Sequence, residues 1–149
     1  VKEQQEFIRR FPTKNPVGFI EGDFDTKEFY SAAKGLENEP ERGMRCTECF
    51  KLRLGRTAEV AEEKGFDLFT STLTISPMKD AALLNRIGQA MGEKCGVEWL
   101  PSDFKKKNGY LRSCQISHEY GIYRQDYCGC VFSYKERQKE KEERTLKEA

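Results

Sequence analysis

Two short apolar segments, each following a helical segment that closes at a glycine, constrain the fold of this chain more than any other feature. One apolar helical stripe ends at Gly65 and leads into the strand-sized segment 67–73, and a second stripe ends at Gly96 and leads into 97–100. Strands that alternate with helices are typical of βαβ units, whose strands run parallel. The sequence therefore predicts an α/β fold in which helices flank a parallel sheet.

Local signals predict further boundaries. Residues 17–20 have the apolar character of another short strand. Asp25 is a favourable helix N-cap, and Phe24 before it can form one half of a hydrophobic staple. Ser76 followed by Pro77 has the pattern of an N-cap and a first helical residue, so a helix is expected to begin there.

The chain is expected to form one domain. Its 149 residues suit a single domain. We predict an α/β domain over 1–133 and a charged helical tail over 134–149, because the tail has almost no apolar residues. Residues 1–11 resemble the last turns of a charged helix, so we expect the domain to be N-terminally incomplete in this sequence.

Composition and the N-terminal residues exclude a membrane-spanning or a secreted protein. No apolar run approaches the ~20 residues of a membrane-spanning helix, and the N-terminus lacks the basic-then-apolar layout of a secretion signal. The 26 Lys and Arg residues against 25 Asp and Glu residues leave a net charge of +1. A nucleic-acid partner would therefore have to bind a local basic patch.

Cys46 and Cys49 form a CxxC motif close to a helix whose start is predicted around Cys49. The helix dipole and the unpaired N–H groups at such a start favour thiolates. Thiolates bind zinc or iron and attack disulfides, so this pair is a candidate metal or redox site. The alternatives are a buried pair without chemistry and half of a structural zinc site.

Cys128 and Cys130 form a CxC motif around Gly129. A disulfide across a single residue closes a small ring that is easily reduced, which suits a catalytic disulfide. Two cysteines that merely pack are the alternative. Because an iron–sulfur cluster usually needs four thiolates, either all four cysteines converge on one metal or Cys46 and Cys49 supply half of a cluster.

A basic turn after the second predicted strand is a candidate nucleic-acid site. Its cations can hold phosphates and its aromatic ring can stack on a base, whereas a solvated lysine cluster is the alternative. Tyr123 and Arg124, before the CxC motif, extend the candidate site. The substrate-binding residues predicted in the turn are Lys105, Lys106, Lys107, Asn108, Tyr110 and Arg112.

Six motifs, in order, resemble those of the QueH-type epoxyqueuosine reductases, and the resemblance covers residues 7–133. The motifs are IEGD (20–23), GLENEP (35–40), RCTECF (45–50), TLTISP (72–77), LPSDFKKKNGY (100–110) and YRQDYCGC (123–130). The resemblance implies a Rossmann-like fold, related to PP-loop and nucleotide-hydrolase domains. It also implies a cytoplasmic enzyme that reduces epoxyqueuosine to queuosine at the wobble base of tRNA without cobalamin.

By the same resemblance, Cys46 and Cys49 correspond to two ligands of a [4Fe–4S] cluster, and Cys128 with Cys130 to a redox-active pair. Members of this family begin with a strand that leads into adjacent cysteines. The resemblance therefore places two further cluster ligands in a preceding βαβ unit that this sequence lacks. We expect the chain alone to bind iron or zinc weakly and below stoichiometry.

The implied reaction requires two electrons, two protons and a group that holds the departing epoxide oxygen. An iron of the cluster, or an additional iron, would serve as the Lewis acid, while Cys128 and Cys130 would store the electrons. Tyr110, Tyr123 or a lysine could deliver protons, and the sequence does not identify the electron donor. A non-catalytic tRNA- or metal-binding remnant and a thiol–disulfide oxidoreductase are the alternative functions.

Overall fold

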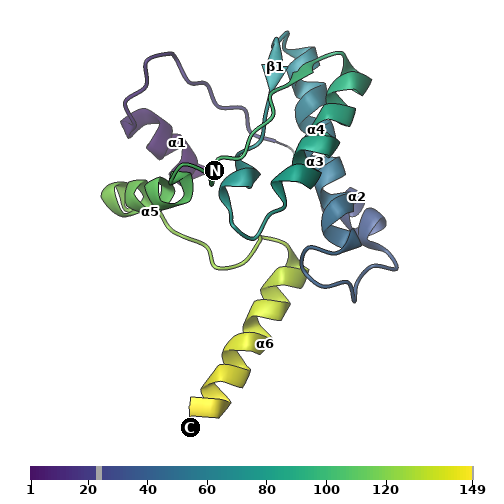
Figure 1. Cartoon of the computed structure of the whole chain (residues 1–149), viewed down its shortest axis with the longest axis vertical. Helices are drawn as coiled ribbons and strands as arrows, with labels where there is room; N and C mark the ends of the chain where they lie inside the picture. Colours follow the sequence, from purple (N-terminus) through teal and green to yellow (C-terminus); the bar gives the residue numbers. More distant parts are fainter. Residues whose placement is uncertain (23–24, 149) are drawn as a thin grey trace.

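The computed structural model describes residues 1–22 and 25–148 and has an α/β fold (Figure 1). Within these residues, helices flank a small parallel sheet of two strands, which confirms the predicted class. The elements in chain order are α1 (Lys2–Arg10), α2 (Thr26–Ala33), α3 (Met44–Glu63), β1 (Leu68–Phe69), the 3-10 helix η1 (Thr72–Ile75), α4 (Ala81–Cys95), β2 (Glu98–Trp99), α5 (Gly109–Tyr120) and α6 (Val131–Glu148).

The sheet consists of β1 and β2, which pair in parallel with Leu68 opposite Glu98 and Phe69 opposite Trp99. The ladder extends past the end of β2, because the backbone N–H of Leu100 donates to the carbonyl of Phe69 at 2.9 Å. The strands predicted within 67–73 and 97–100 are therefore present, although each is shorter than its predicted segment.

The hydrophobic core lies between α3, α4 and the two strands. Figure 1 shows α3 and α4 side by side, with β1 at one end of the pair. The rings of Phe69 and Trp99 meet edge to face with their centroids 5.0 Å apart. The apolar stripe predicted on the helix before Gly65 is the face of α3 that enters this core. The buried core residues are Phe50, Leu54, Ala58, Ala61, Phe69, Leu84, Ile87, Val97 and Trp99.

Close contact between α4 and β2 depends on a glycine. Gly88 faces the indole ring of Trp99, and a Cβ at position 88 would overlap that ring. The indole N–H donates to Asn85 Oδ1 at 3.1 Å. The ring therefore cannot move aside without breaking a partly buried hydrogen bond, which is costly.

The predicted strand at 17–20 is wrong, because these residues form no strand and Val17, Phe19 and Ile20 are exposed. β1 and β2 pair with each other, and an extended segment without a partner strand is not stable by itself. The prediction for α2 is confirmed, since the carboxylate of Asp25 accepts the N–H of Lys27 at 2.8 Å. The staple predicted for Phe24 lies outside the described residues.

The prediction that Ser76 begins a helix is also wrong. Ser76 ends η1, and its Oγ accepts the N–H of Met78 at 3.2 Å. The next helix, α4, starts at Ala81, where Asp80 Oδ1 accepts the N–H of Leu83 at 3.1 Å. A carboxylate is favoured at this position because it meets unpaired N–H groups and the positive end of the helix dipole.

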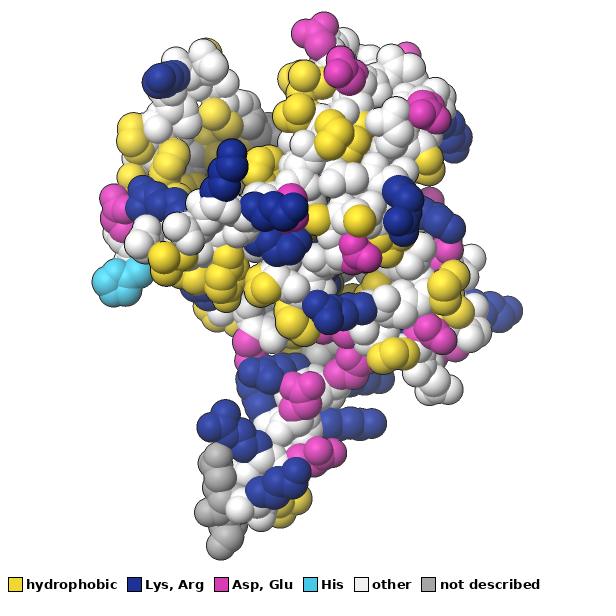
Figure 2. Space-filling model, in the orientation of Figure 1, with side chains coloured by type: hydrophobic (Ala, Val, Ile, Leu, Met, Phe, Trp, Pro, Cys, Tyr) yellow, Lys and Arg dark blue, Asp and Glu magenta, His cyan; other side chains and the backbone are white. Residues whose placement is uncertain are grey.

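Two parts of the chain lie outside the core. α1 packs on α5 through the rings of Phe7, Phe11 and Tyr120, whose centroids are 5.0–5.6 Å apart. α6 begins at Val131, before the predicted tail at 134, and projects away from the other elements (Figure 1). Figure 2 shows basic and acidic side chains interspersed along α6. In the part of the chain that the structure describes, no helix is long and apolar enough to cross a membrane.

Gly88→Ala is expected to lower the free energy of unfolding by about 1–3 kcal/mol, the usual cost of overpacking a core. The matched control is Gly55→Ala, because a Cβ there meets only Met91 Sδ at 3.4 Å. The control should raise stability by about 0.5–1 kcal/mol, since alanine is the better helix former. Urea unfolding followed by circular dichroism measures both. Equal effects of the two substitutions would contradict this account of the α4–β2 contact.

Candidate active site

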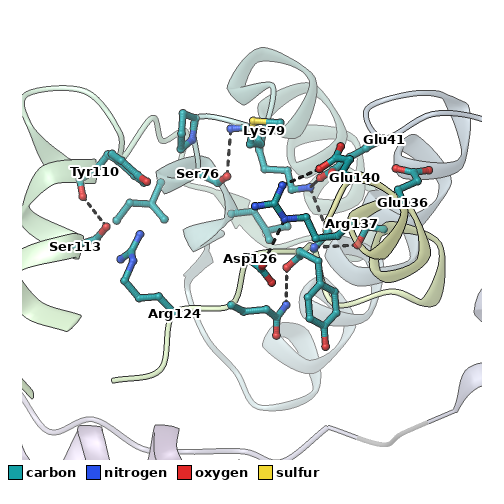
Figure 3. Close-up of a pocket in the computed structure, with 18 residues that line it drawn as sticks. Glu41, Ser76, Lys79, Tyr110, Ser113, Arg124, Asp126, Glu136, Arg137 and Glu140 are labelled. Atoms are coloured by element: carbon teal, nitrogen blue, oxygen red, sulfur yellow. Dashed lines mark hydrogen bonds and ion pairs between the residues drawn. The ribbon is translucent and has the colours of Figure 1, made fainter. Parts of the chain in front are cut away.

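A cavity of about 560 Å³ opens beside the CxC motif (Figure 3). Its wall is built from the segment after β1, the start of α5, the residues before α6 and the first turns of α6. Polar groups in the wall include Glu41, Lys79, Tyr110, Arg124, Asp126, Cys128 and Arg137. The volume lies within the range of about 300–1,000 Å³ that small-molecule sites occupy.

Lys79 is the charged group closest to a thiol in this wall. Its side chain is buried, with the residue 8% exposed. Its Nζ lies 3.0 Å from Cys128 Sγ and 3.0 Å from Glu41 Oε1, and 5.8 Å from the centroid of the Phe50 ring. Burial lowers the pKa of Lys79, but the contacts with Cys128 and Glu41 outweigh burial and raise it above its ordinary value. Lys79 is therefore an ammonium cation at neutral pH.

Ser133 fixes the geometry of the CxC motif. Its Oγ accepts the backbone N–H of Cys128 at 2.9 Å, and its own N–H donates to Cys130 Sγ at 3.4 Å. Gly129 between the two cysteines has a φ of +97°, a left-handed conformation that favours glycine. Cys130 thus lies at the start of α6, and Cys128 lies in the cavity wall.

The CxxC motif lies on α3, which begins at Met44 and so starts earlier than the sequence predicted. Cys46 is in the first turn, where its Sγ accepts the backbone N–H of Arg42 at 3.3 Å, and it packs against the hydrophobic core. Burial is the main cause that raises the pKa of both the Cys46 and the Cys49 thiols. Each thiol must therefore lose a more tightly held proton before it can bind a metal.

The structure brings the two cysteine pairs together. Besides burial, repulsion from Cys128 raises the pKa of Cys46 and Cys49, and Cys130 adds to this effect at Cys49. All four residues are free thiols. Among residues 1–22 and 25–148, no group of three or more His, Cys, Asp or Glu side chains is arranged to hold a metal ion.

Arg45 connects α3 to the rest of the site. Its side chain is only 2% exposed, and its guanidinium donates to the backbone carbonyls of Leu36, Glu37 and Glu39. The same group donates to Glu136 Oε1 on α6 at 3.0 Å. A buried cation with this many acceptors fixes the parts of the chain that supply them.

Two of the eight predicted substrate-binding residues, all of which the structure describes, line the cavity. They are Tyr110 and Arg124, and the guanidinium of Arg124 lies 5.7 Å from the centroid of the Tyr110 ring. Arg124 Nη1 also donates to Ser117 Oγ at 3.2 Å. The predicted residues outside the cavity lining are Lys105, Lys106, Lys107, Asn108, Arg112 and Tyr123.

The basic turn is partly neutralised by its own acidic neighbours. Lys105 and Lys106 pair with Asp103 at 2.8 and 3.4 Å, and the contact with Lys105 lowers the pKa of that carboxyl. Arg112 lies in α5 and pairs with Glu119 at 3.7 Å. Lys106 keeps an exposed ammonium group, with a side chain that is 77% exposed.

Several residues that shape the site are not predicted from the sequence: Glu41, Arg45, Lys79 and Ser133. Lys79 had only a weak signal, because it follows the helix start predicted at Ser76 and Pro77, beyond the first buried strand. Arg45 had none, since arginine is rarely buried unless it is paired.

Comparisons with known proteins support one family. A family model described as "Epoxyqueuosine reductase QueH" matches residues 1–136. A protein named epoxyqueuosine reductase QueH from Streptococcus pyogenes serotype M1 is 48% identical over 133 residues, which cover 88% of this chain and 52% of that protein. The protein of the same name from Staphylococcus epidermidis is 45% identical and covers 89% of this chain and 57% of that protein. The one from Thermotoga maritima is 40% identical, with shares of 78% and 62%.

The fold and the site together define an α/β protein in which Cys128 of the CxC motif lines a cavity and interacts electrostatically with the CxxC pair of α3. The chain belongs to the epoxyqueuosine reductase QueH family, which confirms the resemblance seen in its motifs. It spans about half the length of the curated relatives it matches.

Arg45→Met is expected to lower the free energy of unfolding by about 3 kcal/mol or more, because it leaves a carboxylate and several carbonyls without their buried donor. Arg56→Met is the matched control on the same helix. Arg56 is exposed and pairs with the exposed Glu59 and Glu63, so its removal should change stability little. Guanidinium unfolding measures both variants. An Arg45 variant as stable as the Arg56 variant would show that the buried guanidinium does not hold the site together.

Proposed function

We propose that this chain provides the redox site of an enzyme that converts epoxyqueuosine to queuosine at the wobble base of tRNA. The observation that carries the proposal is the position of Cys128. Its sulfur lies in the wall of a cavity, 3.0 Å from the buried ammonium group of Lys79, with Cys130 close by in the chain. A thiol beside a cation is favoured as the reactive thiolate.

The thiol pair can supply what the reduction needs. Cys128 and Cys130 lose two electrons and two protons when their sulfurs join in a disulfide. The epoxide oxygen takes up two protons and leaves as water, while a carbon–carbon double bond forms. A reductant then returns two electrons to the disulfide. We place this chemistry in the cytoplasm, where the reducing conditions favour thiols over disulfides.

We propose Cys46 and Cys49 as two ligands of a [4Fe–4S] cluster. Residues three positions apart on a helix share a face, and thiolates are the ligands that such clusters use. When bound, the cluster would supply electron transfer, and a cluster iron or an additional iron would supply a Lewis acid. The pair fits half of such a group, so two further thiolates are required from elsewhere.

We propose Tyr110 and Arg124 as contacts of the modified base, because both lie in the cavity wall and the cation lies over the ring. Aromatic rings and guanidinium planes are the surfaces on which proteins stack unpaired bases. The exposed basic turn, together with Asn108, Arg112 and Tyr123, would contact the neighbouring part of the tRNA, with the lysines on its phosphates.

We further propose that β1 and β2 belong to a Rossmann-like sheet of the PP-loop and nucleotide-hydrolase kind. The unit β1–α4–β2 is a βαβ unit with parallel strands. The segment Leu73 to Lys79 follows β1, and Tyr110 follows β2, and both contribute to the cavity wall. Ligands of open α/β sheets bind beyond the carboxyl ends of the strands, which supports this assignment.

Replacement of Cys128 or Cys130 by serine is expected to abolish reduction of epoxyqueuosine in tRNA, because either change removes one of the two sulfurs. Binding of tRNA should be retained. Mass spectrometry of nucleosides after a single turnover measures the conversion, and fluorescence anisotropy measures binding. Cys114→Ser is the control, since this thiol on α5 lies outside the cavity lining.

The assay uses the chain alone and within the longest reading frame that contains it. Serine variants that reduce epoxyqueuosine as well as the parent would show that these sulfurs are not the redox centre. Binding of tRNA without conversion by either parent protein would favour a tRNA- or metal-binding module instead.

The triple substitution of Lys105, Lys106 and Lys107 by alanine is expected to weaken tRNA binding. It should also flatten the dependence of log affinity on log salt by ~0.7–0.9 for each phosphate that the variant no longer binds. Thermal stability should fall only slightly, because Lys106 and Lys107 are exposed and only Lys105 is half-buried, paired with Asp103 at 2.8 Å. The matched control replaces the exposed Lys27, Lys34 and Lys64 by alanine, which changes the net charge equally. If both triple variants show the same salt slope, the basic turn does not contact the tRNA backbone.

A further inference from the structure

Lys79 combines burial with two charged or polarisable partners in the cavity wall. A buried lysine is costly unless its charge is paired, and its Nζ lies 3.0 Å from both Cys128 Sγ and Glu41 Oε1. We propose that Lys79 is a positioning residue of the thiol pair. Its ammonium group donates to the Cys128 sulfur and holds it at the cavity wall as the nucleophile of the pair, and Glu41 competes for that ammonium group.

The charges that surround Cys128 support this assignment. Lys79 Nζ donates to the sulfur at 3.0 Å, and a hydrogen bond from a charged donor is stronger than one between neutral groups. Cys46 and Cys49 on α3 oppose it, since each interacts unfavourably with a charged Cys128. Glu41 contacts the ammonium rather than the sulfur. It therefore competes with Cys128 for the same cation.

The charged groups of α6 in the cavity wall have other partners. Glu136 binds the guanidinium of Arg45 at 3.0 Å, and Arg137 pairs with Asp126 at 3.3 Å. The second sulfur, Cys130 Sγ, receives the N–H of Ser133. The two sulfurs of the CxC motif therefore receive hydrogen bonds from different groups. Cys128 contacts the ammonium group of Lys79, whereas Cys130 contacts a backbone N–H group at the start of α6.

This inference rests on the proposed use of Cys128 as a redox thiol, but it is tested without tRNA. Iodoacetamide alkylates a thiolate: the sulfur forms a bond to carbon and iodide leaves. The reduced chain is treated at pH 7.5, and peptide mass spectrometry follows each cysteine separately. Lys79→Met is expected to slow alkylation of Cys128 by about tenfold or more. The same variant should leave the rates at Cys130 and Cys114 nearly unchanged.

A second variant separates electrostatics from structure. Glu41→Gln removes the competitor for the ammonium, so alkylation of Cys128 should keep its rate or become faster. Lys79→Met and Glu41→Gln break the same ion pair, so a purely structural role would change both in the same direction. Lys79→Arg keeps the cation and should retain a rate close to that of the parent.

The matched control is Lys51→Met, which removes an exposed lysine paired with Glu48 at 2.8 Å on α3 and should not alter the rate at Cys128. Circular dichroism reports the folding of every variant. The proposal is overturned if Lys79→Met leaves the rate at Cys128 unchanged, or if Glu41→Gln slows it as Lys79→Met does. If Lys79→Met does not fold, Glu41→Gln provides the test. Slower alkylation of Cys128 in Glu41→Gln contradicts the proposal, and an equal or faster rate supports it. Since the assay contains no epoxyqueuosine, its failure is distinct from failure of the proposed reduction.

Discussion

The buried guanidinium of Arg45 is the contact on which the site depends. It joins α3 and the nearby segment 36–39, whose carbonyls it binds, to Glu136 on α6, which lies far away in the sequence. Its face also lies 4.4 Å from the ring centroid of Phe132. The CxxC motif follows Arg45 directly, and the CxC motif directly precedes α6. This one side chain therefore holds the elements that carry both thiol pairs.

α3 can support such a costly group because its other face is anchored in the core. Phe50 and Leu54 are almost fully buried, and burial of side chains of this size stabilises by about 1.5–3 kcal/mol each. The contact of Gly88 with Trp99 holds α4 and β2 tightly against the same core. The stability that comes from the core of α3, α4 and β2 thus offsets the free-energy cost of desolvating Arg45 and the thiols.

The features of the fold that sequence patterns predicted are those governed by short-range chemistry. Apolar periodicity and closing glycines located α3, α4 and the strands between them, because these signals act within a few residues. The strand at 17–20 failed because a strand needs a partner, and pairing is decided by residues far away in the chain. The helix start at Ser76 failed because a competing cap, Asp80, lies nearby.

In the site, too, local patterns were predicted and contacts between distant parts of the chain were not. The four cysteines were found because CxxC and CxC are local patterns, whereas their approach to each other depends on the contacts of Arg45 on α3 with Phe132 and Glu136 on α6. Lys79 is buried only because Glu41 and Cys128, from opposite sides of it in the chain, supply its partners. A lysine in a sequence is by default a solvated charge. Its desolvation here has a cost that an apolar residue would avoid, and one partner of its ammonium group at the cavity wall is the sulfur of Cys128, the proposed redox thiol.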